Sequence, residues 1–195
     1  MIQAKEVSFG YGGVLILRRL NLQVEEGQRL LLSGPSGGGK TTLLRLLCGL
    51  LKPQAGQIAA PDRLGVVFQE DRLIPGLTAL ENIQLVSSQL QALDLLEELG
   101  LAEEAGSLPG ALSGGQRRRI ALARALACPS QALLLDEPFK GLDPAARSQA
   151  AQCLLGRSGS KPLLTISHDE QDAELLQAQP VSLRRLQEDP PDRLS

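Results

Sequence analysis

The sequence predicts an α/β fold built on a mostly parallel sheet, because short apolar runs alternate with longer segments of helical periodicity. Four runs have the length and apolarity of fully buried strands, namely 29–33, 64–68, 132–135 and 163–166. The segment 40–50 follows the first of them and places leucines on one helical face. The first two dozen residues alternate around Gly12-Gly13, which predicts a small antiparallel sheet.

A helical layer is expected between the second and third of these strands, over about residues 71–130. Thr78 and Glu81 form a capping box, and Leu90, Leu93, Leu96 or Leu99 continue the helical spacing. Ser113 is expected to cap a helix that runs to about Ala127, and Asp143-Pro144 to open another. We expect one domain over 1–187, followed by a loose tail at 188–195 that carries two prolines.

Composition excludes several classes of function. The 20 basic and 22 acidic side chains give a net charge of −2, which argues against a surface that neutralises nucleic acid. Cys48, Cys128 and Cys153 are widely spaced, and with a single histidine they predict buried, reduced thiols and no zinc site. The N-terminus lacks a signal-peptide pattern and the stretch 43–51 is too short to span a membrane, so a soluble chain is expected.

Residues 34–41, GPSGGGKT, match G-x-x-x-x-G-K-[ST] between a predicted strand and a predicted helix. The glycines allow the backbone N–H groups to surround phosphates, Lys40 brings a charge to the outer phosphates, and Thr41 offers a hydroxyl to Mg²⁺. This motif predicts a nucleoside triphosphate site.

Residues 132–137, ALLLDE, end a buried strand in two carboxylates. Buried charges need a partner, and Mg²⁺ is the natural one beside a phosphate-binding loop. Asp136 is therefore expected to hold Mg²⁺ through water, and Glu137 to polarise a water molecule for in-line attack.

The string Leu112-Ser-Gly-Gly-Gln116, followed by basic residues and IALARAL, resembles the signature motif of ATP-binding cassette (ABC) ATPases. A serine and two glycines at a helix N-terminus suit a γ-phosphate. The resemblance extends from Val7 to about Leu186 and implies the P-loop NTPase, RecA-like fold. It also implies two copies in a head-to-tail dimer, with two ATP molecules and Mg²⁺ at the seam.

The resemblance gives roles to isolated residues as well. Tyr11 matches the aromatic side chain that stacks on adenine, although neighbouring Phe9 leaves the register open. Gln69 matches the Q-loop glutamine and His168 the switch histidine, whereas Asp143 matches the D-loop and would also serve as a plain helix cap.

Taken together, the motifs and the resemblance assign nucleotide binding to Tyr11, Gly34, Pro35, Ser36, Gly37, Gly38, Gly39, Lys40, Thr41, Thr42, Ser113, Gly114, Gly115, Gln116 and Asp143. Catalysis is assigned to Glu137, His168 and Gln69, and Mg²⁺ ligation to Thr41, Gln69 and Asp136.

Two details depart from the resemblance or stay outside it. Lys140 stands where the family usually has a small or hydroxyl residue. The arginines at 117–119 are expected to be mostly solvated, because three adjacent residues cannot share a helix face.

The favoured function is the cytoplasmic ATPase subunit of a membrane transporter, peripheral on the inner face of the membrane through separate permease subunits. The stretch FQEDRLIPGLTALENI is most similar to bacterial importers of small oxyanions and organic acids such as nitrate, sulfonates and taurine. A soluble ABC ATPase of DNA repair or translation is the alternative, and a P-loop kinase would leave LSGGQ and His168 unexplained.

Overall fold

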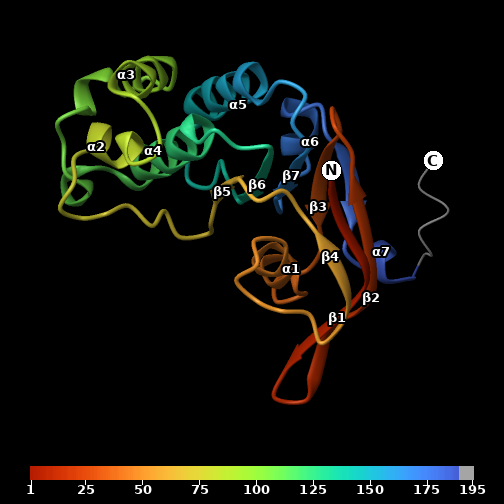
Figure 1. Ribbon diagram of the computed structural model, residues 1–195. Helices are drawn as coiled ribbons and strands as arrows, with labels where there is room; N and C mark the ends of the chain where they lie inside the picture. Colours follow the sequence, from red (N-terminus) through yellow and green to blue (C-terminus); the bar gives the residue numbers. More distant parts are fainter. Residues whose placement is uncertain (189–195) are drawn as a thin grey trace. The chain divides into compact units, whose positions relative to one another are not determined.

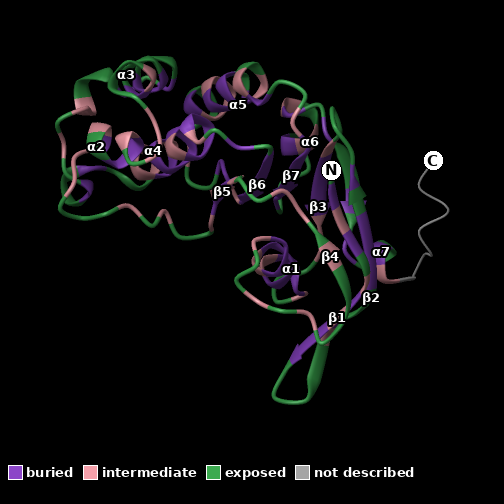
Figure 2. Cartoon of the chain, in the orientation of Figure 1, coloured by how far each residue is buried: buried purple, intermediate pink, exposed green. Residues whose placement is uncertain are grey.

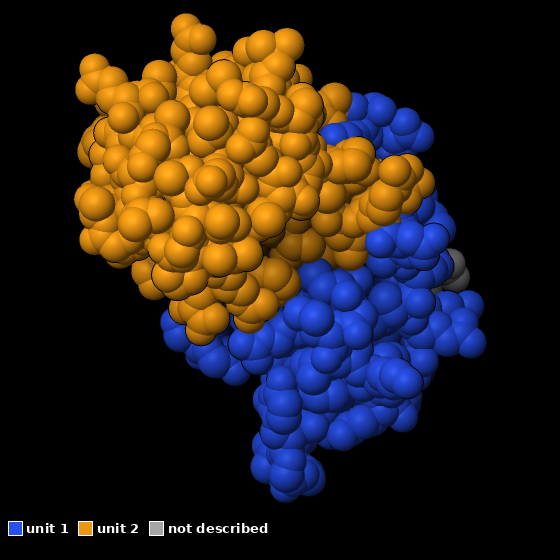
Figure 3. Space-filling model, turned by 60° about the vertical axis from the view of Figure 1, so that its left-hand side comes forward, with its two compact units in different colours: residues 1–62, 160–195 blue, residues 63–159 orange. Residues whose placement is uncertain are grey.

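The computed structural model describes residues 1–188 and divides into two compact units (Figure 3). Unit 1 contains residues 1–62 and the described residues from 160 onward, and unit 2 contains residues 63–159. Each unit has strands and helices of its own, labelled in Figure 1. In the described part of the chain no helix is both long and apolar enough to cross a membrane.

Unit 1 contains the expected antiparallel sheet. Strands β1 (Ile2–Tyr11), β2 (Val14–Val24) and β4 (Ala55–Ala59) pair in the order β2-β1-β4. Gly12 and Gly13 both have positive φ, of 55° and 82°, so they close the β1–β2 hairpin with the turn that matches strand twist. At Gly56 a Cβ atom would lie 2.3 Å from the carbonyl oxygen of Glu6, so only glycine fits at that contact between strands.

Unit 1 also contains three parallel strands in the order β7-β3-β8. These are β3 (Arg29–Ser33), β7 (Leu163–Ile166) and β8 (Gln179–Ser182). The first two confirm the sequence expectation. Strand β8 was not among the expected strands. It contains Pro180 and lies at the sheet edge, where a missing N–H is tolerated.

Three helices accompany these strands in unit 1. They are α1 (Lys40–Leu47), α6 (Gln171–Leu175) and α7 (Arg185–Glu188). Helix α1 ends three residues earlier than expected, because Gly49 at φ 70° follows its cap at Cys48. The predicted loose tail begins at Glu188, the last described residue, and otherwise lies outside the described part of the chain.

Unit 2 combines two parallel strands with four α-helices. The strands, β5 (Leu64–Val67) and β6 (Ala132–Asp136), confirm two further expected runs, and β6 is buried along its length (Figure 2). The helices are α2 (Ala79–Gln84), α3 (Gln89–Glu98), α4 (Gly114–Ala127) and α5 (Pro144–Ser158), with short 3₁₀ turns at Ala102–Glu104 and Pro109–Ala111.

The prediction of continuous helical spacing between residues 78 and 99 was partly wrong. The chain forms two helices there, because Ser88 caps a new one by accepting a hydrogen bond from the Gln91 N–H at 3.3 Å. This changes the buried face of α3, so that Leu90 is 72% exposed and Leu93 40% exposed. The side chains that α3 buries are Ala92, Leu95 and Leu96.

The three cysteines are not joined in disulfides, as expected, but only Cys153 is buried, whereas Cys48 and Cys128 are half-buried.

Candidate functional site

The first candidate element is the loop between β3 and α1 in unit 1. Gly34, Gly37 and Gly39 have φ angles of 145°, 74° and 104°, which L side chains rarely adopt. A Cβ atom at Gly39 would also lie 2.7 Å from the Ile16 side chain. Helix α1 begins at Lys40, and its N-cap residue Gly39 provides no side-chain cap, so the first N–H groups of the helix lack an intrahelical acceptor. The loop therefore presents backbone N–H groups in the way that an anion site requires.

Lys40 lies at the start of α1 and is only 6% exposed. Its ammonium donates hydrogen bonds to the carbonyl oxygens of Gly34 and Pro35, at 2.8 and 2.9 Å. The lysine side chain thus folds back over the loop that precedes it. This places one positive charge against the glycine-rich backbone, where a polyphosphate would need it.

His168 follows β7, the strand that pairs in parallel with β3 through Leu32 and Ile166. The two strands therefore bring the glycine-rich loop and His168 to the same edge of the unit 1 sheet. His168 is exposed, and the segment around it is fixed locally. The Ser167 hydroxyl donates to buried Asp172 at 2.5 Å and accepts from the Asp169 N–H at 3.1 Å.

The two aromatic residues of β1 differ in exposure, which bears on the register left open by the sequence. Phe9 is 8% exposed, whereas Tyr11 is 46% exposed at the end of the strand. Their rings meet edge to face, with centroids 5.0 Å apart. Tyr11 therefore has a ring surface available for stacking, and Phe9 belongs to the core.

In unit 2 the candidate residues again follow adjacent parallel strands. Gln69 comes after β5, and Asp136 ends β6, which pairs with β5 through Val67 and Leu135. Asp136 is 2% exposed, whereas Gln69 is exposed. Glu137 has φ 53°, a left-handed backbone conformation that is unusual outside glycine.

The Ser113-Gly114-Gly115 segment begins helix α4 through a complete capping box. The Ser113 hydroxyl accepts from the Gln116 N–H at 3.2 Å, and the Gln116 side chain accepts from the Ser113 N–H at 2.8 Å. The amide of Gln116 also donates to Glu104 at 2.6 Å. Gln116 thus stabilises the start of the helix through its side chain. The Ser113 hydroxyl accepts one hydrogen bond there and can still donate its proton to another group.

A cavity of about 500 Å³ opens beside this helix start within unit 2. Its walls include Ser113, Gly114 and Gly115 on one side, and Lys140 and Asp143 on another. Asp143 caps α5 by accepting from the Ala146 N–H at 2.9 Å, so the plain cap expected for it is present. Lys140, the departure from the resemblance, therefore lies in the same cavity as the signature segment.

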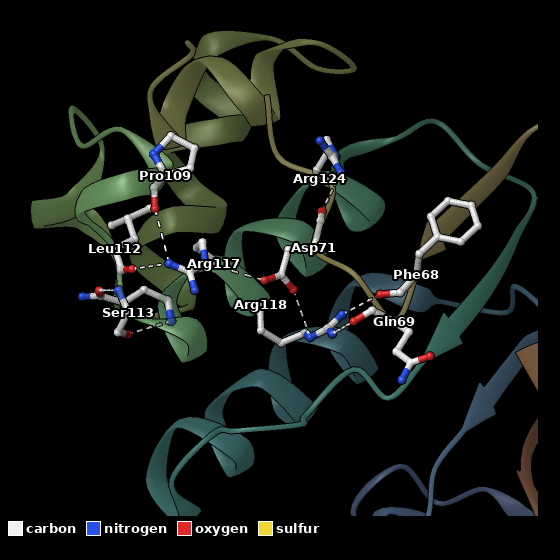
Figure 4. A network of polar contacts seen from close by, with 10 residues as sticks. Phe68, Gln69, Asp71, Pro109, Leu112, Ser113, Arg117, Arg118 and Arg124 are labelled. Atoms are coloured by element: carbon white, nitrogen blue, oxygen red, sulfur yellow. Dashed lines mark hydrogen bonds and ion pairs between the residues drawn. The ribbon is translucent and has the colours of Figure 1, made fainter. Parts of the chain in front are cut away.

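The arginines after the signature were expected to be solvated, and for Arg118 this was wrong. Arg118 is 4% exposed, and its side chain extends from α4 to the segment after β5 (Figure 4). Arg117 and Arg119 are half-buried, and each donates to a backbone carbonyl, of Leu112 and Leu99, at 2.7 Å. The helical spacing to Leu122 and Ala125, which are also buried, places Arg118 on the inner face and could have revealed it.

The structure thus brings predicted residues together in one place in unit 1 and in two places in unit 2. Residues 34–42 and His168 lie at one sheet edge in unit 1, and Gln69, Asp136 and Glu137 lie at one sheet edge in unit 2. The cavity of unit 2 is lined by Gln69 together with Ser113, Gly114, Gly115 and Asp143. Within the described residues no group of three or more His, Cys, Asp and Glu side chains forms a metal site. The oxygen donors of Thr41, Gln69 and Asp136 are of the type that Mg²⁺ prefers when phosphates complete its shell.

A glycine-rich loop between a strand and a helix, with acids ending a parallel strand, defines a P-loop nucleotide-binding protein. Residues 17–140 match the family model described as ABC transporter. The chain therefore belongs to the ABC transporter family of ATP-binding proteins, as the resemblance had indicated.

Curated relatives support the same assignment. The aliphatic sulfonates import ATP-binding protein SsuB 1 of Pseudomonas fluorescens is 39% identical over 181 residues, which are 90% of this chain and 70% of that protein. SsuB 3 of Paraburkholderia xenovorans is 48% identical over 141 residues, covering 70% of this chain and 57% of that protein. The chain thus spans between 57% and 70% of the length of these two relatives.

Solved structures confirm the P-loop fold class. The ATP-binding cassette MJ0796, solved as a dimer in a post-hydrolysis state with ADP and Pi, superposes with a TM-score of 0.83 at 30% identity. The match covers 93% of this chain and 94% of that one. A second dimeric structure of the same bacterial cassette gives a TM-score of 0.82.

Proposed function

We propose that this chain is the ATP-hydrolysing subunit of an ABC importer and that it works as a dimer of two copies. One observation supports the proposal: the chain has two glycine-containing helix starts whose chemistry suits a phosphate, the loop before α1 and the capped Ser113 segment before α4. A self-sufficient P-loop enzyme needs only the first. A second such segment has a purpose if it completes the site of another copy.

Nucleotide binding is proposed for the residues at the edge of unit 1. Backbone N–H groups of residues 34–42 would surround the phosphates, and the Lys40 ammonium would leave the Gly34 and Pro35 carbonyls to meet the outer phosphates. The exposed ring of Tyr11 would stack on adenine. His168 would contact the γ-phosphate.

Hydrolysis is proposed to depend on Mg²⁺, held by Thr41, Gln69 and Asp136. Mg²⁺ held by these residues would supply positive charge beside the phosphates during hydrolysis. Glu137 would accept a hydrogen bond from the attacking water and orient it. Its left-handed backbone supports this role, because strained residues of this kind cluster where a side chain must be aimed.

The dimer and the membrane partners are proposed from the relatives. The two MJ0796 cassette structures are dimers, and head-to-tail pairing would place Ser113 and Asp143 of one copy against the ATP of the other. The curated relatives are named aliphatic sulfonates import ATP-binding proteins, which favours a small organic acid as cargo here. We expect separate permease subunits, a peripheral position on the cytoplasmic face of the membrane, and no nucleic-acid partner.

Two measurements test this function. The purified chain should hydrolyse ATP only with Mg²⁺, and Lys40→Ala should remove ATP binding by calorimetry, whereas Lys52→Ala, at an exposed lysine outside the loop, should not. Tagged chain isolated from its own membranes should retain integral membrane subunits. Recovery of ribosomes or DNA in their place would favour the soluble alternative, and unchanged ATP binding by Lys40→Ala would contradict the nucleotide site.

A further inference from the structure

The segment after β5 is held by arginines of α4, which begins at the signature motif and is called the signature helix. Residues 68–72 form neither helix nor strand, so their carbonyl groups lack regular backbone partners. The Arg118 guanidinium donates to the Phe68 carbonyl at 2.7 Å and to the Gln69 carbonyl, and its Nε lies 3.2 Å from the Asp71 carboxylate. Figure 4 shows all three contacts made from one side chain.

A second arginine of α4 holds the same segment at residues that follow Gln69 in the chain. Arg124 donates to the carbonyl groups of Asp71 and Arg72, at 3.1 and 3.0 Å. Four carbonyl groups of residues 68–72 therefore accept hydrogen bonds from side chains of α4. Of the two arginines, only Arg118 contacts the backbone of Gln69 itself.

The chemistry of this contact requires arginine. A guanidinium presents several N–H donors in a fixed plane, so it can serve two successive carbonyls and a carboxylate together. A lysine would keep the positive charge beside Asp71 but would lack the coplanar N–H donors that serve both carbonyl groups. Because the Arg118 side chain is only 5% exposed, water is poorly placed to substitute for a lost donor.

The contact also joins two functional segments along one rigid element. Arg118 lies five residues after Ser113, which is about 7 Å along a helix whose inner face is buried. A shift of the signature segment therefore moves the backbone that carries Gln69. In the proposed dimer Ser113 serves the nucleotide of the other copy, whereas Gln69 serves the nucleotide of its own copy.

We infer that Arg118 is a positioning residue that sets Gln69 by tying its backbone to the signature helix. The residue thereby links the two nucleotide sites of the dimer. This inference rests on the proposed function, in which both segments contact ATP. It does not require Arg118 to touch nucleotide.

The test is a set of ATPase measurements on the full chain with Mg²⁺, corrected for folded fraction by circular dichroism. We expect Arg118→Lys to lower kcat about tenfold or more while the KM for ATP changes less than about twofold, since losses of this size are typical when the support of a metal-site residue is removed. Arg124→Lys is the matched control on the same helix, and we expect its kcat to stay within about twofold of wild type.

A double variant separates positioning from general damage. If Arg118 acts through Gln69, then Arg118→Lys in a Gln69→Ala background should lower kcat by less than about twofold beyond Gln69→Ala alone. Multiplicative losses, or equal losses in Arg118→Lys and Arg124→Lys, would overturn the inference. If Arg118→Lys does not fold, Arg118→Gln replaces it, because a neutral amide leaves no unpaired charge in the interior.

Failure of the inference and failure of the proposed function are distinguishable. Lys40→Ala and Glu137→Gln report on the function alone. If both abolish turnover and Arg118→Lys does not lower it, only the positioning role is wrong. If neither abolishes turnover, the proposed function is wrong.

Discussion

Glu137 occupies a left-handed backbone conformation directly after Asp136, at the end of a strand that is buried along its length. The sequence showed two acids at a strand end and predicted separate roles for them. It could not show the backbone conformation of Glu137, since a positive φ at a glutamate has no local sequence signal. The same limit explains Arg118, whose charge suggested solvent while its helical spacing to buried residues indicated the interior.

The proposed role of Glu137 makes a direct prediction. Glu137→Gln removes the charge that polarises water but keeps the shape of the side chain, so ATP binding should persist while hydrolysis falls by about 100-fold or more. With ATP and Mg²⁺, gel filtration should show a stable dimer. Glu97→Gln, at an exposed position on α3, is the control and should hydrolyse normally. Full activity in the Glu137 variant would remove it from the mechanism.

At the scale of elements, most of the strands and helix starts followed from local chemistry. The capping residues Thr78 and Ser113 correctly predicted two helix starts, and the apolar runs correctly predicted four strands. Two elements differed from the expectation for different reasons. Strand β8 depends on tertiary packing, because it is formed despite Pro180 at a sheet edge. Helix α3 depends on a local signal, because Ser88 caps a new helix and so changes its buried face.

Helices α3 and α5 are joined by an ion pair that predicts a pH dependence of stability. The Arg157 guanidinium hydrogen-bonds the Glu98 carboxylate and lowers its pKa from the ordinary value of 4.5. The folded state therefore gains stability above that ordinary pKa and loses it as pH falls through the lowered one. The same carboxylate accepts from the Cys153 thiol, whose pKa burial raises to about 12.

We expect Arg157→Gln to lower the free energy of unfolding at pH 7 by about 0.5 to 1 kcal/mol, since the pair is partly exposed. The difference from wild type should shrink as the pH is lowered below 4.5. Urea unfolding at several pH values measures it, with Lys52→Gln, at an exposed lysine, as control. A difference that is constant from pH 7 to about pH 3 would contradict the assigned ion pair.

At the scale of the whole molecule, the central claim is that each ATP is completed by the signature segment of another copy. The structural role of Ser113 does not test this claim, because a serine at this position would cap α4 whether or not it also contacts ATP. If capping were its only role, its loss would cost about 1 kcal/mol of stability and leave turnover per folded molecule unchanged. The claim therefore needs a measurement in which two lesions lie in different copies.

That measurement is the steady-state ATPase rate of a mixture of Ser113→Arg and Lys40→Ala chains. Each variant alone should be inactive, since every site of its dimer carries one lesion. In a mixed dimer one site carries both lesions and the other carries neither. An equal mixture should recover up to about a quarter of the wild-type rate, because half of randomly formed dimers are mixed and each has one intact site. A mixture as inactive as its components, with mixed dimers demonstrated by differently tagged copies, would contradict the shared site.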